Sequence, residues 1–175
     1  AGETEGDYEL TSQPVEPVKK GAMALHYVRK GLVAVAVDNT SCAELSDNGY
    51  FDYLNTSRIL LEMGWSYLGL TAYQDWIVLN WMKGQDFVNK ERIIVSGFSL
   101  GTEPLMVLGA LDPSIYAFVY NDFLCRTLER ILVMTEPDSK GARPFPNSIE
   151  HLIPGFLTQF DFPDLVAALA PRPVI

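Results

Sequence analysis

The sequence predicts an α/β fold with a doubly wound, mostly parallel sheet. Three apolar runs of strand length, at 32–37, 92–96 and 115–120, alternate with segments whose apolar residues recur at helical spacing, and a fourth run starts at 174–175. Runs that are apolar throughout are typical of strands covered on both faces. Their alternation with helices is the pattern of βαβ units, which place parallel strands side by side.

The composition is that of a globular domain with a large core. The chain has 175 residues, 48% of them hydrophobic, and a formal net charge of -9. This acidic balance argues against nucleic acid and anionic membrane surfaces as partners, because both require a basic surface. No apolar run approaches membrane length, so we expect a soluble protein. Residues 1–17 are acidic and lack periodicity, which predicts an irregular surface segment before a domain at 18–175.

The two cysteines do not indicate a metal or redox site. Cys42 and Cys125 are far apart and lack the C-x-x-C spacing of zinc and thiol–disulfide motifs. We therefore predict no metal and no cofactor. A disulfide between them stays open at this point, and no oligomeric state is predicted.

The first half of the chain contains three predicted helices, each followed by a glycine. They span 18–30, 53–63 and 71–83. A loop is expected at 39–50, and the third helix is expected to start with a capping box formed by Thr71 and Gln74. Four side chains of that helix recur on one face and are expected in the core: Tyr73, Trp76, Ile77 and Trp81.

The second half of the chain continues the alternation. A helix is predicted at 102–110, where Pro104 is tolerated in the first turn, and Asp112 and Pro113 end it. The remaining predictions are a helix or strand at 123–134, a loop at 137–146, a helical piece from Ile149 capped by Asn147 or Ser148 and interrupted at 154–155, and a short helix from Pro163.

The segment G-F-S-L-G at 97–101 predicts a nucleophile elbow. It lies between a strand and a helix, with Ser99 at the tip and glycines on both sides where side chains would collide. The N–H of Leu100 is then expected to donate to the oxyanion of an acyl-transfer reaction, and Glu103 to complement the helix dipole. The alternative is a helix N-cap serine in a nucleotide-binding turn, or an inert loop. Neither phosphate-loop motif is present.

A serine nucleophile needs a base and an orienting acid. His26 precedes Ser99 and is expected to be a packing or surface residue, because the order in this type of site is Ser, acid, His. His151 follows Ser99 and is a candidate base with Asp122 as the acid; alternatively, it braces the loop that follows it. Asp122 ends a predicted strand and is alternatively a carboxylate at the pocket rim, and Asp38 has the same reading.

Five stretches together resemble the acetyl xylan esterase-like branch of the α/β-hydrolases: 94–104, 120–125, 143–148, 151–155 and 168–173. The most specific are G-F-S-L-G-T-E-P and A-L-A-P-R-P, and the resemblance covers 18–175. It implies an esterase that removes acyl groups, acetyl in particular, from plant-polysaccharide or related carbohydrate esters. Ser99 is the catalytic residue that carries over. The resemblance also implies a secreted or periplasmic location.

In proteins of this kind the acid follows the strand that begins here near Pro173, and the histidine comes later. The resemblance therefore implies that the chain is part of a longer protein, in which both triad partners and the strand supplying a second oxyanion donor lie outside residues 1–175. The competing prediction is a catalytically inactive binding domain that keeps the hydrolase scaffold. A sheet cut at Ile175 has an unpaired edge, so we expect the isolated segment to be poorly stable.

Overall fold

The computed structural model describes these parts of the chain: residues 22–46, 52–122, 124–137, 139–141 and 148–175. The predicted irregular segment 1–17, the start of the helix predicted at 18–30, Asn147 as a cap and most of the loop at 137–146 lie outside the described residues.

Two parallel strands form the centre of the structure. β1 (Ile94–Phe98) pairs with β2 (Ala117–Asn121) along their full length, from Ile94 opposite Ala117 to Phe98 opposite Asn121. On the other side of β2, Val174 forms a parallel bridge with Phe118. The N–H groups of Phe118 and Tyr120 donate to the carbonyls of Pro173 and Ile175, so residues 173–175 lie parallel to β2 at the edge of the sheet. These three stretches form part of the predicted sheet.

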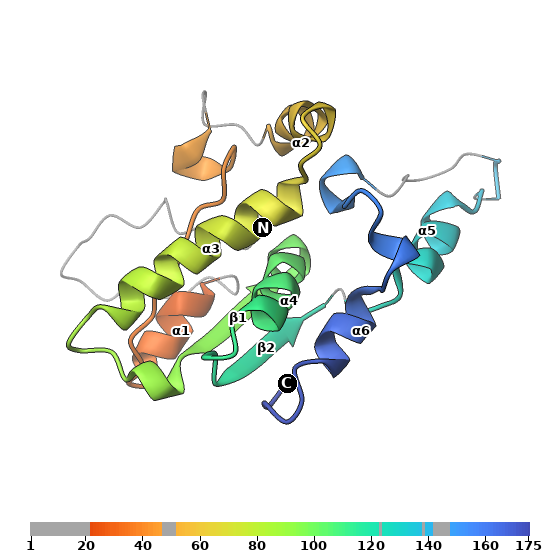
Figure 1. Ribbon diagram of the computed structural model, residues 1–175. Helices are drawn as coiled ribbons and strands as arrows, with labels where there is room; N and C mark the ends of the chain where they lie inside the picture. Colours follow the sequence, from red (N-terminus) through yellow and green to blue (C-terminus); the bar gives the residue numbers. More distant parts are fainter. Residues whose placement is uncertain (1–21, 47–51, 123, 138, 142–147) are drawn as a thin grey trace.

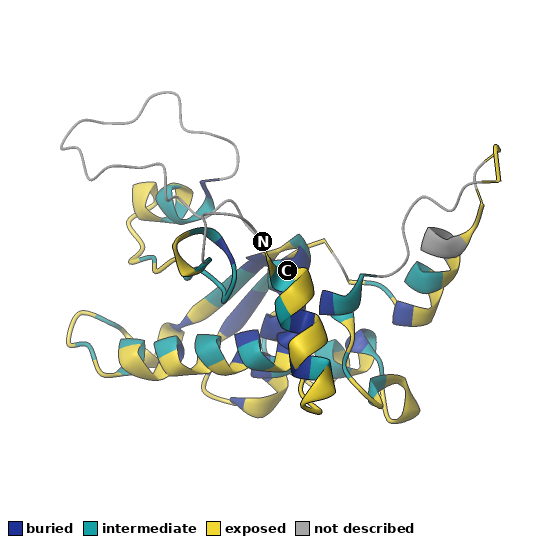
Figure 2. Cartoon of the chain, turned by 90° about the horizontal axis from the view of Figure 1, so that it is seen from above, coloured by how far each residue is buried: buried dark blue, intermediate teal, exposed yellow. Residues whose placement is uncertain are grey.

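Helices cover the sheet on both faces (Figure 1). The α-helices are α1 (Met23–Arg29), α2 (Tyr53–Glu62), α3 (Tyr67–Lys83), α4 (Thr102–Leu111), α5 (Thr127–Thr135) and α6 (Phe162–Ala167). Short 3-10 turns are η1 (Ala43–Leu45), η2 (Lys90–Arg92), η3 (Ser99–Gly101), η4 (Ile149–His151) and η5 (Phe156–Thr158). The views in Figures 1 and 2 place α3, α4 and α6 on one face and α1 on the other.

Helix α4 is the centre of the core. It packs against β1, α3 and α6, and most of its residues are buried. The approach to the sheet is close at Gly109, where a Cβ would lie 2.6 Å from the ring of Phe118. In Figure 2 the buried residues gather on the strands and on the helix faces turned toward them.

The start of α3 differs from the prediction. The helix begins at Tyr67, where the Ser66 hydroxyl accepts a hydrogen bond from the Gly69 N–H at 3.0 Å. Ser66 is therefore the N-cap. The capping box predicted at Thr71 is wrong, because the Thr71 hydroxyl lies inside the helix and donates to the Tyr67 carbonyl at 3.1 Å.

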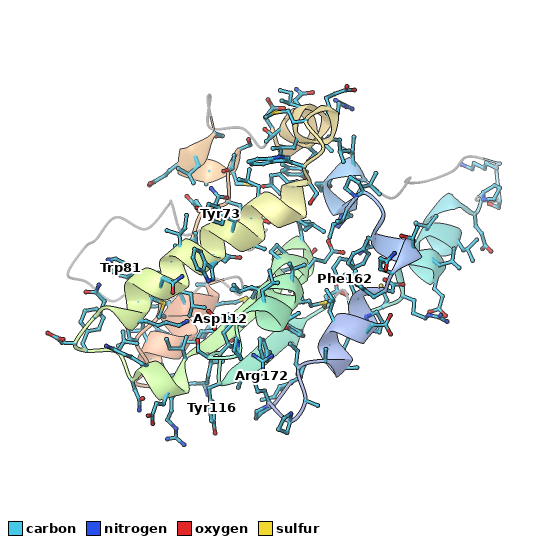
Figure 3. The ribbon with its side chains drawn as sticks, viewed as in Figure 1. Tyr73, Trp81, Asp112, Tyr116, Phe162 and Arg172 are labelled. Atoms are coloured by element: carbon cyan, nitrogen blue, oxygen red, sulfur yellow. The ribbon has the colours of Figure 1, made fainter. Side chains whose placement is uncertain are left out.

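The face of α3 that lies in the core is also not the predicted one. The side chains expected to be buried are all between 44% and 57% exposed: Tyr73, Trp76, Ile77 and Trp81. Figure 3 shows Tyr73 and Trp81 along this helix. The buried residues of α3 are instead Tyr67, Leu68, Thr71, Ala72 and Leu79. Both faces of the helix carry apolar side chains, so periodicity alone could not choose which one is buried.

The valine-rich run at 32–37 does not form the predicted strand. Among the described residues, it contains no strand and no bridge, and Leu32 and Val33 are at least half exposed. A parallel strand needs a neighbour that supplies a complete hydrogen-bonded ladder. The described residues place β2 on one side of β1 and no strand on the other, so apolar composition alone was insufficient.

For the remaining elements, the predicted type agrees with the structure better than the predicted length does. The described part of 39–50 is irregular apart from η1, and the mixed stretch at 123–134 is helical as α5. The piece predicted from Ile149 is one 3-10 turn. In α6, Pro163 occupies the first turn and Asp161 is the N-cap, in a capping box with Asp164. No helix in the described ranges has the length and apolarity needed to cross a bilayer.

Candidate active site

Ser99 lies in a tight turn between β1 and α4. Its φ is 53°, a left-handed conformation that non-glycine residues rarely adopt. A Cβ on Gly97 would lie 2.4 Å from the Gly101 carbonyl oxygen and 2.8 Å from the Thr102 Cα, so only glycine fits there. A Cβ on Gly101 would meet nothing within 4 Å. The prediction that a side chain at this second glycine would collide is therefore wrong.

The turn leads directly into the N-terminus of α4. Leu100 is 7% exposed, which anchors the turn in the core, and Gly101 is the N-cap without a side-chain hydrogen bond. The first N–H groups of a helix have no carbonyl partner within the helix, and they form the positive end of its dipole. An oxyanion beside Ser99 would meet this end. The Leu100 N–H as its donor stays a prediction.

Asp122 lies next to this turn at the same edge of the sheet. The strands match up to Phe98 opposite Asn121, so Ser99 and Asp122 each follow the last matched pair. Asp122 also has a left-handed backbone, with a φ of 77°, and it is exposed. The Thr102 hydroxyl donates to the Asn121 carbonyl at 3.3 Å and ties the start of α4 to the end of β2.

His151 binds Glu103, which the sequence predicted only to complement the dipole of α4. Its Nδ1 lies 2.7 Å from Oε2 of Glu103, whose side chain is fully buried in the first turn of α4. The other carboxylate oxygen of Glu103 lies 2.5 Å from Nη1 of Arg130 on α5. Glu103 therefore holds a buried ion pair, a closer involvement than the dipole interaction predicted for it. The structure brings His151 to Glu103.

A second buried carboxylate lies on the other side of the imidazole. Glu150 Oε1 is 3.8 Å from His151 Nε2, and the Ser148 hydroxyl donates to Glu150. Burial raises the pKa of the nearby Tyr67, which keeps its hydroxyl protonated so that it donates to the Thr40 carbonyl at 2.8 Å.

The other candidates lie apart from this cluster. His26 is exposed on α1, and Asp38, in the loop before η1, accepts a hydrogen bond from the Glu44 N–H in η1 at 3.3 Å. Cys42 and Cys125 are both free thiols, which answers the question of a disulfide. In the part of the chain that the structure describes, no three or more His, Cys, Asp or Glu side chains are arranged to hold a metal ion.

The local sequence around Arg130 and Asp75 gave little indication of their tertiary contacts. Arg130 reaches Glu103 from 27 residues further along the chain, and only the tertiary fold brings them together. Asp75 lies among the buried residues of α3, and burial raises its pKa from 3.8 to about 7. Asp75 is one helical turn from Thr71 and from Leu79, and this spacing indicates a position near the core only when the buried face of α3 is known.

The helix-covered parallel sheet, with Ser99 in a left-handed turn between β1 and α4, is consistent with part of an α/β-hydrolase fold. The Abhydrolase family model matches residues 2–175, and the chain belongs to this family. One similar solved structure is a "putative acetyl xylan esterase" from Bacteroides fragilis, with 63% sequence identity and a TM-score of 0.79. The match covers 86% of this chain and 40% of that one, so the chain spans about two fifths of that protein's length. No curated protein matches.

Proposed function

We propose that this chain carries the nucleophile of a serine esterase that removes acyl groups, acetyl in particular, from carbohydrate or related esters. The observation that carries the proposal is the left-handed Ser99 in the turn that Gly97 makes possible. Family membership and the similarity to the Bacteroides fragilis protein support hydrolase chemistry. An inactive binding domain is therefore not favoured.

In the proposed reaction, Ser99 Oγ attacks the ester carbonyl while a histidine accepts its proton. The oxyanion of the tetrahedral intermediate accepts a hydrogen bond from the Leu100 N–H. Collapse of the intermediate breaks the bond to the sugar oxygen, which leaves with the proton from the histidine. Water then hydrolyses the acyl-serine and releases the acid, restoring Ser99.

The histidine and its acid are proposed to lie outside residues 1–175. His26 is exposed on α1, and the Nδ1 of His151 is bound to Glu103. Among the described residues, the Ser99 hydroxyl makes no side-chain hydrogen bond. The similar solved protein is also more than twice as long as its matched part. Asp122 is then a carboxylate at the edge of the substrate site, beside Ser99.

The test is covalent labelling of the full-length protein with a fluorophosphonate, followed by peptide mapping. We expect the label on Ser99, and we expect Ser99→Ala to abolish both labelling and hydrolysis of p-nitrophenyl acetate. Ser96→Ala is the matched control, because Ser96 lies on β1 and its hydroxyl is hydrogen-bonded to Tyr27 at 2.8 Å. A folded protein without label on Ser99 would reject the nucleophile. Release of acetate from acetylated xylo-oligosaccharides tests the substrate class.

A further inference from the structure

We infer that Glu103 is a positioning residue for the reaction at Ser99. Its buried carboxylate fastens the first turn of α4 to two distant elements through Arg130 and His151, and this holds the Leu100 N–H where the oxyanion forms. The inference rests on the proposed function of Ser99.

Both oxygens of Glu103 are engaged. Oε1 contacts Arg130 from α5 and Oε2 contacts His151 from η4, at 2.5 Å and 2.7 Å. The three side chains are 0%, 8% and 10% exposed, so little water competes for these bonds. A carboxylate held at both oxygens by partners 27 and 48 residues further along the chain cannot rotate independently of the elements around it.

Neither the helix dipole nor stability alone explains this arrangement. An exposed acidic side chain in the first turn would complement the dipole without the cost of desolvation. Buried ion pairs are often replaceable by apolar side chains without loss of stability, whereas they can specify one geometry. A fixed direction for the first turn of α4 is what Glu103, Arg130 and His151 add.

The first turn of α4 is continuous with the turn that carries Ser99. A left-handed serine is an unfavourable backbone conformation that persists only when its surroundings determine it. Gly97 packs against Gly101 on the strand side, and Thr102 bonds to Asn121 at the end of β2. Glu103 attaches the same turn to α5 and η4. Without it, the reactive groups can shift, and a small misplacement greatly slows a reaction that depends on alignment.

The test compares Ser99 phosphonylation and ester turnover in the full-length protein. Glu103→Gln keeps the side-chain shape and removes the charge; we expect kcat and the labelling rate to fall at least about tenfold, with KM within about twofold. Arg130→Met is expected to act in the same direction, and Arg130→Lys to recover most of the rate because it keeps a cation. Lys83→Met is the control, because it breaks the 2.8 Å ion pair with Asp112 at the opposite end of α4.

The outcomes separate the two proposals. Unlabelled wild-type Ser99 would reject the proposed function itself. Wild-type rates in folded Glu103→Gln would overturn the inference and leave the nucleophile in place. Equal rate losses in Lys83→Met and Glu103→Gln, in proportion to the loss of Tm, would mean that Glu103 acts only on stability, which also overturns it. If Glu103→Gln does not fold, His151→Asn replaces it with the same readouts and the same expected result.

Discussion

The two ends of helix α4 are treated differently by the structure. At the C-terminal end, Arg172 donates to the carbonyls of Gly109 and Asp112 at 2.7 Å and 2.9 Å, and Lys83 pairs with the Asp112 carboxylate. Figure 3 labels Asp112 and Arg172 in this region. At the N-terminal end, the N-cap residue is Gly101, which has no side chain to cap the helix, and the preceding residue, Leu100, is buried.

This difference separates the contacts that stabilise α4 at its C-terminal end from the N-terminal N–H groups proposed to take part in the reaction. The carbonyls at the end of a helix are satisfied by cations, which also complement the dipole. A missing N-cap costs free energy, and an uncapped N-terminus can bind an anion. In this structure Arg172 bonds the carbonyls at the C-terminal end of α4, whereas Thr102 and Glu103 fix its first turn through other elements and no cap side chain bonds its N–H groups. In the proposed reaction, these N–H groups face the oxyanion at Ser99. Substitutions at the two ends should then have separable effects on stability and on reactivity.

The largest effect is expected at Gly97. In Gly97→Ala, a Cβ would lie 2.4 Å from the Gly101 carbonyl oxygen, and both are backbone positions that cannot move independently. We expect a loss of about 3 kcal/mol in the free energy of unfolding, together with loss of Ser99 labelling. Urea denaturation and fluorophosphonate labelling measure the two. Gly101→Ala is the matched control, because its Cβ would meet nothing within 4 Å. Equal stability of the two variants would contradict the close-approach argument.

Arg172→Ala is expected to cost about 2 kcal/mol with no change in the reactivity of the remaining folded protein. The substitution removes charged hydrogen bonds to two carbonyls of α4 and a contact of the guanidinium with the Phe118 ring, 5.0 Å from its centroid. Arg172→Lys should recover less than half, because a single ammonium cannot reproduce the forked geometry.

Arg92→Ala is the control for Arg172→Ala. Arg92 is exposed and lies 5.6 Å from the centroid of the Tyr116 ring, so it offers a cation–π contact alone. We expect a cost of about 0.5 kcal/mol in urea denaturation. Equal costs for the two alanine variants would show that the carbonyl bonds of Arg172 contribute little.

What the sequence could predict follows the range of the interactions involved. The turn at 97–101 and the glycines that end the first two helices depend on neighbouring residues, and the structure contains them. Gly31 and Gly64 end those helices with φ values of 82° and 78°, as their positions indicated. The apolar runs at 92–96 and 115–120 also indicated two strands, which the structure forms at Ile94–Phe98 and Ala117–Asn121. The family resemblance is also confirmed by the family match.

Long-range choices were not readable in the same way. The run at 32–37 has the composition of a strand, but a strand exists only with a partner. The aromatic side chains of α3 have helical spacing, but the opposite face of that helix is apolar too. The contacts of Glu103 join residues 27 and 48 positions apart, and no local pattern marks such a cluster. The turn that carries Ser99 could therefore be predicted from the local sequence and the contacts of Glu103 could not, while the catalytic role of Ser99 stays a prediction.

Asp75 lies in the middle of α3, and we predict that its burial makes the stability of the protein depend on pH. Burial raises its pKa from 3.8 to about 7, because the charged form loses hydration without gaining a partner among the described residues. Between these pH values the native state binds a proton that the unfolded state does not. The free energy of unfolding should therefore decrease as pH rises from about 4 to about 7, and then level off.

Asp75→Asn should remove this pH dependence and stabilise the protein by about 1–2 kcal/mol at pH 8. Urea denaturation at pH 5 and pH 8 measures it, and Asp86→Asn, in the turn after α3, is the control. A wild-type slope in Asp75→Asn would show that other groups cause the pH dependence. Ser99 labelling should not change, since Asp75 lies outside the turn.

The smallest effect is expected from Lys83→Met at the C-terminal end of α4. Burial alone would raise the pKa of Asp112, but hydrogen bonds from Lys83 and Ser114 outweigh it and hold this pKa below its ordinary value of 3.8. The stabilisation is thus present above that value and is lost as pH falls through the lowered pKa. We expect Lys83→Met to cost about 0.5–1 kcal/mol at pH 7, and we expect this cost to disappear as pH falls through the lowered pKa of Asp112 and its carboxylate is protonated. A cost that persists in acid would mean that the Lys83 side chain contributes by packing instead of charge, and the C-terminal end of α4 would then owe its stability to Arg172 alone among the cations described.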